Sequence, residues 1–152
     1  MRRRTILATS IAAAAVGLLP RTGATSEEAA QPILDRLRSV RRDMHLPEML
    51  PHPALAEMAR LQVLQMHRLG FATHMGIDGC DPPARGVRAG YTGHILGEAL
   101  AETWDGPCET VDLWLAHDET RAVLLDAAAR DVGVSGARGD TGITRWDLVV
   151  GF

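Results

Sequence analysis

GFATH, residues 70–74, directly follows the longest apolar-patterned segment of this chain. Apolar residues before it recur at spacings of three and four, which predicts a helix from Pro53 to about Leu69 that ends at Gly70. They cover a wide arc, so we expect this helix to be buried on more than one side. The fold is therefore expected to form around it, with His74 just beyond its end.

Three further short motifs follow along the chain. They are Gly90-Tyr91, Gly97-Glu98, and a segment in which Trp114 precedes His117 by about one helical turn. Together with His74 they carry imidazole and carboxylate groups on well-separated segments. The set predicts one polar cleft assembled from distant parts of the chain, whereas the other residues are typical of a scaffold.

Periodicity and turn residues predict the remaining elements. In chain order we expect helices from Pro32 to about Met44, Pro107 to about Ala116 and Asp118 to about Ala129, a short strand at His94–Gly97, and strands at Asp131–Val134 and Ile143–Phe152. The stretch 71–92 is rich in Gly, Pro and Asp and is predicted to be a loop. Helices followed by a small, largely antiparallel sheet indicate an α+β fold.

Residues 1–24 have the pattern of a cleaved export signal. Arg2-Arg3-Arg4 is a charged start, an apolar run extends from Ile6 to Leu19, and Thr22-Gly23-Ala24 supplies small residues for cleavage. The run is too short for a membrane span, so no stable span is expected after cleavage. Arg3-Arg4-Thr5-Ile6-Leu7 also resembles a twin-arginine motif, so the Sec and twin-arginine routes both stay open for a periplasmic or extracellular destination.

The rest of the chain is expected to form a flexible leader at residues 25–31 and one domain at residues 32–152. Removing residues 1–24 takes four of the sixteen basic residues and none of the nineteen acidic ones, which leaves a net charge of −7. This charge argues against nucleic acid or an anionic membrane as a partner. A small molecule, a lipid or a component of the cell envelope is the expected partner.

The chain has two cysteines, Cys80 and Cys108. In an exported protein an even number of cysteines favours a disulfide, here closing a span that would stabilise the fold by roughly 3–4 kcal/mol on the loop-entropy relation. A zinc site built on two lone cysteines needs histidines at tight spacing, which the sequence lacks. A Cys80–Cys108 disulfide is therefore predicted.

The ordered motifs resemble those of the CAP superfamily, the SCP-like cysteine-rich secretory, antigen 5 and pathogenesis-related proteins, and specifically its small exported bacterial branch. The resemblance runs from about Ile33 to Phe152. GFATH resembles the family's G-x-F-x-H stretch, and residues 79–91, with Arg85, resemble its D-G-x-x-P-x-x-R…G-Y segment. Gly97-Glu98-Ala99 stands where the family has Gly-Glu-Asn, and WLAHDETR, residues 114–121, where bacterial members have W-M-x-S-P-x-H-R. The resemblance implies a three-layer α-β-α sandwich.

The resemblance also implies a cleft with two histidines and two glutamates, which holds a divalent metal in some members. His74 and Glu98 match the first histidine and the first glutamate. His117 falls at the second glutamate and Arg145 at the second histidine, while Ala99 replaces the family's asparagine. The cleft of this chain is thus a variant.

The chemistry of these residues supports more than one role. His74, Glu98 and His117 could bind zinc with one position left open, or act as acid–base groups. His117 is equally typical of an exposed helix end. Arg145 in the cleft would repel a cation and offer an anion site, which favours ligand capture over metal chemistry. One register off, it would be a surface arginine next to Asp147. Trp114 is expected to be a core anchor and a candidate for the cleft wall.

Three functions remain open. The first is an exported domain that binds a small ligand, lipid or envelope component without catalysis. The second is a metal-assisted or acid–base hydrolase, similar to a peptidase, that uses His74, Glu98 and His117. The third is a structural or interaction module. No serine or cysteine has flanking residues of a catalytic motif, and the resemblance implies no settled reaction, so the first is favoured over the enzyme.

Overall fold

The structure is a computed structural model that describes residues 26–152. Within this range the chain forms, in order, α1 (Ser26–Asp43), β1 (Leu50–Pro51), α2 (Pro53–Leu69), α3 (Pro82–Arg88), β2 (Ile95–Thr103), α4 (Pro107–Ala116), α5 (Asp118–Leu124), β3 (Asp131–Arg138) and β4 (Thr144–Gly151). No helix in the described part is long and apolar enough to cross a membrane. The predicted export signal, residues 1–24, lies outside the described residues.

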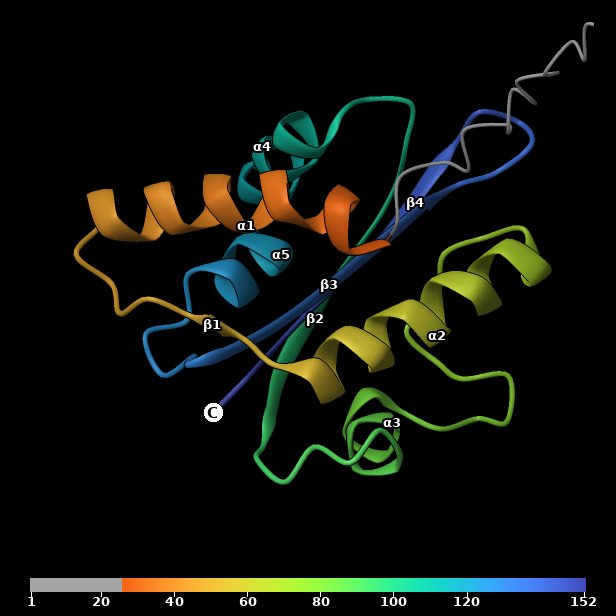
Figure 1. The fold of residues 1–152 in the computed structure, drawn as a ribbon, viewed down its shortest axis with the longest axis horizontal. Coiled ribbons are helices and arrows are strands. Elements are labelled where there is room, and N and C mark those ends of the chain that lie inside the picture. The colour runs from red at the N-terminus through yellow and green to blue at the C-terminus, as the bar shows by residue number, and fades with distance from the viewer. Residues whose placement is uncertain (1–25) are drawn as a thin grey trace, which may run out of the picture.

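The elements form three layers around one sheet. Figure 1 shows α1, α4 and α5 on one side of the strands and α2 and α3 on the other. The strand order is β1-β3-β4-β2, with β1 parallel to β3 and the other neighbours antiparallel. The predicted α+β, α-β-α sandwich with a mostly antiparallel sheet is therefore confirmed.

The two faces of the sheet differ in chemistry because side chains alternate along each strand. The face under α1, α4 and α5 is apolar and carries the larger core, which includes Val132, Trp146 and Leu148. The face under α2 and α3 mixes a small apolar cluster with buried polar side chains: Glu98, Ser135, Arg145 and Asp147. The polar candidates lie on this second face.

Helix α2 has the bounds that the sequence predicts. Pro53 occupies its first turn, and Nδ1 of His52 accepts a hydrogen bond from the Ala54 amide at 3.2 Å. Gly70 ends the helix with φ +83°, a left-handed conformation that favours glycine, and its N–H donates to the Met66 carbonyl. His74 lies just beyond this end, in the segment that leads from α2 to α3.

Other boundaries differ from expectation. Helix α1 begins at Ser26, so residues 26–31 are helical, and Ala30 is buried in the core. Helix α3 lies inside the expected loop, where Asp81 caps it by accepting from the Ala84 amide at 2.9 Å. Strand β2 continues past Gly97 to Thr103, because pairing with β4 outweighs the low strand propensity of Glu and Ala. Helix α5 ends at Leu124 rather than near Ala129.

The predicted Cys80–Cys108 disulfide is not formed, and both cysteines are free. Cys80 precedes α3, whereas Cys108 lies in the first turn of α4, on the other side of the sheet. A disulfide requires the two Cα atoms to lie within about 7 Å, which the intervening sheet prevents.

Gly133 sets how closely α2 approaches the sheet. A Cβ at this position would lie 2.1 Å from the carbonyl carbon of Leu55, a backbone atom of α2. A Cβ at Gly97 would instead meet the Val123 side chain at 2.6 Å.

We expect Gly133→Ala to lower the free energy of unfolding by about 2–3 kcal/mol, as overpacking does. In urea titrations, Val123→Ala should restore the stability that Gly97→Ala removes, because the obstacle at Gly97 is a side chain. Leu55→Ala should not restore the stability of Gly133→Ala, because the obstacle there is backbone.

Candidate functional site

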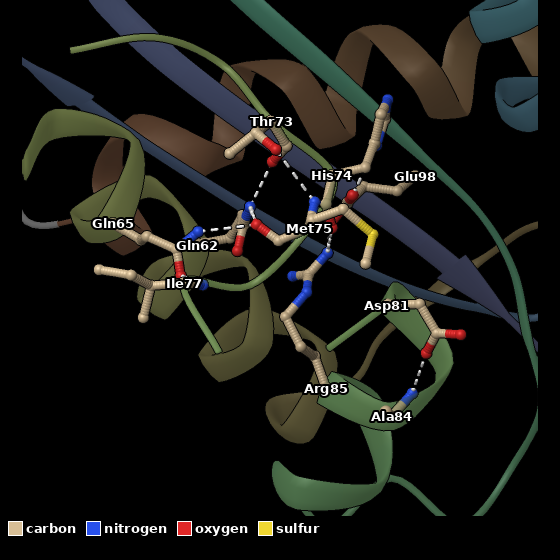
Figure 2. A network of polar contacts seen from close by, with 10 residues as sticks. All are labelled: Gln62, Gln65, Thr73, His74, Met75, Ile77, Asp81, Ala84, Arg85 and Glu98. Atoms are coloured by element: carbon tan, nitrogen blue, oxygen red, sulfur yellow. Dashed lines mark hydrogen bonds and ion pairs between the residues drawn. The ribbon is translucent and has the colours of Figure 1, made fainter. Parts of the chain in front are cut away.

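Three segments meet at the carboxylate of Glu98. His74 comes from the loop after α2, Arg85 from α3 and Glu98 from β2, and Figure 2 shows their side chains converging. Nδ1 of His74 lies 2.7 Å from Oε2 of Glu98, and Nη2 of Arg85 donates to Oε1 at 2.6 Å. Both oxygens of one carboxylate are thus occupied.

The loop that carries His74 is held by its neighbours on both sides. Gln62 and Gln65 of α2 donate from Nε2 to the carbonyls of Thr73 and Met75, the second at 2.8 Å. Nη2 of Arg85 also donates to the His74 carbonyl at 2.8 Å. These contacts set the position of the imidazole before any ligand arrives.

The three side chains differ in exposure. The Glu98 side chain is 2% exposed and that of Arg85 11%, whereas that of His74 is 56% exposed. Glu98 and Arg85 are therefore buried partners that orient the imidazole, and His74 is the group of the three that solvent reaches.

A fourth group, Asp147 of β4, lies beneath them. It is fully buried, and neither carboxyl oxygen has a hydrogen-bond partner among the described residues. Burial, followed by the negative charge of Glu98, raises the pKa of Asp147 well above its ordinary value. Nε and Nη1 of Arg85 are likewise buried without partners in the described part of the chain. The charge of Arg85 opposes the rise in the pKa of Asp147, but burial and Glu98 outweigh it.

Two predicted candidates, Trp114 and His117, come from the α4–α5 segment and line a groove beside β2. His117 is exposed at the junction of α4 and α5 and lines a groove of about 600 Å³. Trp114 is buried, and its Nε1 donates to the Leu100 carbonyl at 2.9 Å. No hydrogen bond or ion pair joins His117 to the His74–Glu98 pair in the described part of the chain. Trp114 both anchors the core and lines this groove.

Arg145 lies on the same sheet face as Glu98 but further along the strands, opposite Glu102. Its Nε donates to Oε1 of Glu102 at 2.7 Å, and its Nη2 donates to the Gly70 carbonyl at 2.8 Å. Arg145 therefore secures the end of α2. The guanidinium beside Glu98 belongs to Arg85, which the sequence reasoning quoted in a motif without assigning it a role.

The proposed zinc ligands His74, Glu98 and His117 do not fit a metal centre. The described residues contain no group of three His, Cys, Asp or Glu side chains placed to hold an ion. Both Glu98 oxygens are already engaged, one by the cationic Arg85, which disfavours a second cation at the same carboxylate.

Glu119 and Asp147 also escaped the sequence reasoning. Glu119 lies in the first turn of α5, and its negative charge helps to raise the pKa of His74. Asp147 interrupts an otherwise apolar strand, Trp146–Val150, and a lone acid in such a run was the available signal of a buried carboxyl.

A pocket of about 190 Å³ opens beside this cluster. Its walls come from α2, α3 and the intervening loop, and include Met58, Leu61, Gln62, Ile77 and Arg85. Leu61 and Ile77 are 50% and 76% exposed, so an apolar rim surrounds the opening. Arg85 contacts both the pocket and the His74–Glu98 pair.

The pKa of His74 provides a test of the cluster. The hydrogen bond to Glu98 raises this pKa above its ordinary 6.5, against an opposing effect of burial. The bond thus stabilises the fold fully below about pH 6.5, and the stabilisation is lost as the pH rises through the folded-state pKa. We expect an NMR titration midpoint above 6.5, which Glu98→Gln lowers. Glu102→Gln, on the same strand, should leave it unchanged; equal midpoints in all three proteins would contradict the arrangement.

The raised pKa of Asp147 predicts a second dependence of the folding stability on pH. Because its folded pKa is raised, its burial destabilises the fold increasingly as the pH rises above about 3.8. An asparagine at this position has nearly the same shape as aspartate and carries no charge at any pH. We expect Asp147→Asn to raise the free energy of unfolding at pH 8 by about 1 kcal/mol or more, since each pH unit of difference corresponds to about 1.4 kcal/mol. Urea unfolding at pH 4 should show no gain, and exposed Asp140→Asn should show none at either pH.

The sequence matches no protein-family profile and no curated protein, but solved structures share its architecture. An outer surface protein of Borrelia burgdorferi superposes with a TM-score of 0.77 at 16% identity, over 84% of this chain and 95% of that chain. An extracellular SCP-domain protein of Bacillus anthracis gives 0.72 at 18% identity, over 85% and 44%.

A cysteine-rich secretory protein of Staphylococcus aureus gives a TM-score of 0.67 at 14% identity, over 88% of this chain and 41% of that chain. This chain spans less than half of the Bacillus and Staphylococcus proteins. Likeness at such identities concerns the fold, and it agrees with the order of the motifs: the described chain has the fold of the CAP superfamily, that of the SCP domain.

Proposed function

We propose that this chain is an exported binding domain that captures a small amphiphilic ligand beside His74 without changing it chemically. Export is supported by the pattern of residues 1–24 and by the nature of the proteins with similar structures, which are outer surface, extracellular and secretory proteins. The ligand class follows from the pocket and its neighbours.

The observation that carries the proposal is the shared position of Arg85. It lines the apolar pocket and also holds the Glu98 carboxylate that orients His74. At about 190 Å³ the pocket is smaller than the roughly 300–1,000 Å³ of drug-sized sites, so it accepts only part of a ligand, such as the end of an acyl chain. A polar or acidic head group would then reach the exposed imidazole.

Binding is favoured over catalysis because the cluster lacks a nucleophile. Among the described residues no Ser, Thr or Cys side chain bonds to His74, and the nearby Thr73 hydroxyl accepts from the Met75 amide at 3.1 Å. Glu98 is already neutralised by Arg85. The pair can orient a ligand without a reacting group at hand.

One observation supports a second candidate, an acid–base hydrolase. An exposed histidine oriented by a buried carboxylate is the arrangement of a general base that activates water. A hydrolase of this kind would use His74 with Glu98 and would need neither a metal nor His117.

Calorimetric titration with decanoate, and with decyltrimethylammonium as the opposite head group, tests the proposal. Leu61→Asp places a charge on the pocket wall and should weaken decanoate binding by about tenfold or more, a loss of about 1.4 kcal/mol. Val87→Asp is the matched control, because Val87 is exposed on α3 outside the pocket lining. Equal affinity in both variants would contradict the pocket assignment.

The same preparation distinguishes the other candidates. Hydrolysis of p-nitrophenyl decanoate that disappears in His74→Ala would establish the hydrolase in place of the binding domain. If neither binding nor turnover is detected, the structural or interaction module remains as the function.

A further inference from the structure

Arg41, near the end of α1, is buried without an opposite charge in contact with it. The residue is 1% exposed. Its Nε donates to the Pro47 carbonyl at 2.9 Å, and its Nη1 donates to the carbonyls of Leu124 and Asp126 at 2.8 and 3.0 Å. All three acceptors are neutral, and no ion pair among the described residues includes Arg41.

Charges further away do not neutralise this guanidinium. Burial lowers the pKa of Arg41, while the negative charge of Asp126 opposes this effect and the positive charge of Arg130 adds to it. The lowered pKa means that the fold disfavours the charge. Because arginine stays protonated in proteins, the charge remains, and an anion next to it would stabilise it.

One nitrogen of Arg41 is still available to such an anion. Nη2 is buried and has no hydrogen-bond partner among the described residues. Nε and Nη2 lie on the same edge of the planar guanidinium, so Nη2 points in the direction in which Nε meets Pro47. The chain continues from Pro47 to Met49 and Pro51, which line a small cavity together with Arg41. Nη2 is thus directed at this cavity.

The cavity lies between α1 and the strands β1 and β3, and its size limits what it can hold. Its volume is about 10 Å³, close to the minimum that holds one water-sized particle. Apart from Arg41 and Arg38, its lining is apolar and includes Leu34, Met49 and Val132. A polyatomic anion is too large for this space, which leaves a single ion or a water molecule.

The chemistry of the lining favours an ion over water. A buried water typically makes about three hydrogen bonds, and its own hydrogens need acceptors. The side chains around the cavity offer nitrogen donors and no oxygen acceptor, which suits an anion. The attraction comes from Arg41, because the charge of Arg38 is matched by Asp35 and Glu48.

We propose that this cavity binds a monatomic anion, a halide such as chloride, against Nη2 of Arg41. The ion supplies the negative charge that no described residue places next to the guanidinium. Arg41 also holds the carbonyls of Pro47, after α1, and of Leu124, at the end of α5. The ion therefore stabilises the junction of these helices with β1, and the chloride content of the medium affects the stability of the fold.

This inference does not depend on the proposed amphiphile site. The pocket between α2 and α3 and the cavity beside α1 share no lining residue. Binding of decanoate and binding of chloride can therefore fail separately.

Thermal unfolding of the purified protein tests the site. Sodium gluconate is replaced stepwise by sodium chloride at constant ionic strength, because gluconate is too large for the cavity while general screening stays the same. Chloride at about ten times its Kd should raise the unfolding temperature by about 3–5 °C, since an ion that binds only the folded state stabilises it. Bromide should act like chloride. Equal unfolding temperatures in all three salts would overturn the proposal.

Variants assign the effect to Arg41. Leu34→Phe fills the cavity and leaves the arginine in place, whereas Arg41→Met removes the charge. Both should lose the response to chloride, and Arg42→Met, at an exposed arginine of the same helix, should keep it. A response that persists in Leu34→Phe contradicts the proposal even if Arg41→Met does not fold.

Bromide also provides a direct measurement. In crystals grown with sodium bromide, anomalous diffraction should show a peak within hydrogen-bond distance of Nη2 of Arg41. Peaks on the surface alone would identify an adventitious ion only, and density without an anomalous signal in the cavity would assign the site to water. Either result rules out the halide site.

Discussion

The carboxylate of Glu98 is the constraint on which the candidate site depends. It is buried, and two groups from different elements satisfy it: Arg85 of α3 and His74 of the loop after α2. Removing one partner of a buried ion pair leaves an uncompensated charge, which costs about 3–5 kcal/mol. Because Arg85 also bonds to the His74 carbonyl, one guanidinium determines the position of the loop, the helix and the imidazole together.

The sheet makes this arrangement possible by separating two tasks. The face under α1, α4 and α5 is apolar and supplies most of the core. The face under α2 and α3 can then carry Glu98, Arg145 and Asp147, each a cost to stability unless paired or protonated. Arg145 and Glu102 secure the end of α2 at one end of this face, while Arg85 and Glu98 hold the exposed histidine at the other. One polar face thus serves both as scaffold and as candidate site.

Sequence reasoning reached the local features and missed the long-range pairing of charges. The bounds of α2 followed from periodicity and its glycine end, and the family-like order of motifs led to the correct layers. It also brought His74 and Glu98 together. It named Arg145 as the arginine of the cleft, whereas Arg85 is the one that bonds to Glu98, because motif alignment does not show which arginine crosses from a neighbouring helix. It predicted a disulfide from cysteine count alone, which says nothing about the sheet between the two residues. Sequence reasoning missed α3 because it took Gly86 as a sign of a loop. Gly86 is needed for close packing against Ile95 rather than for a turn.

The two unlinked thiols have a consequence for where this fold can form. The described domain obtains its native shape from packing and ion pairs without a covalent crosslink. Such a domain can fold in a reducing compartment as well as in an oxidising one. Formation of the fold is thereby independent of the thiol oxidation on which many small disulfide-stabilised domains depend.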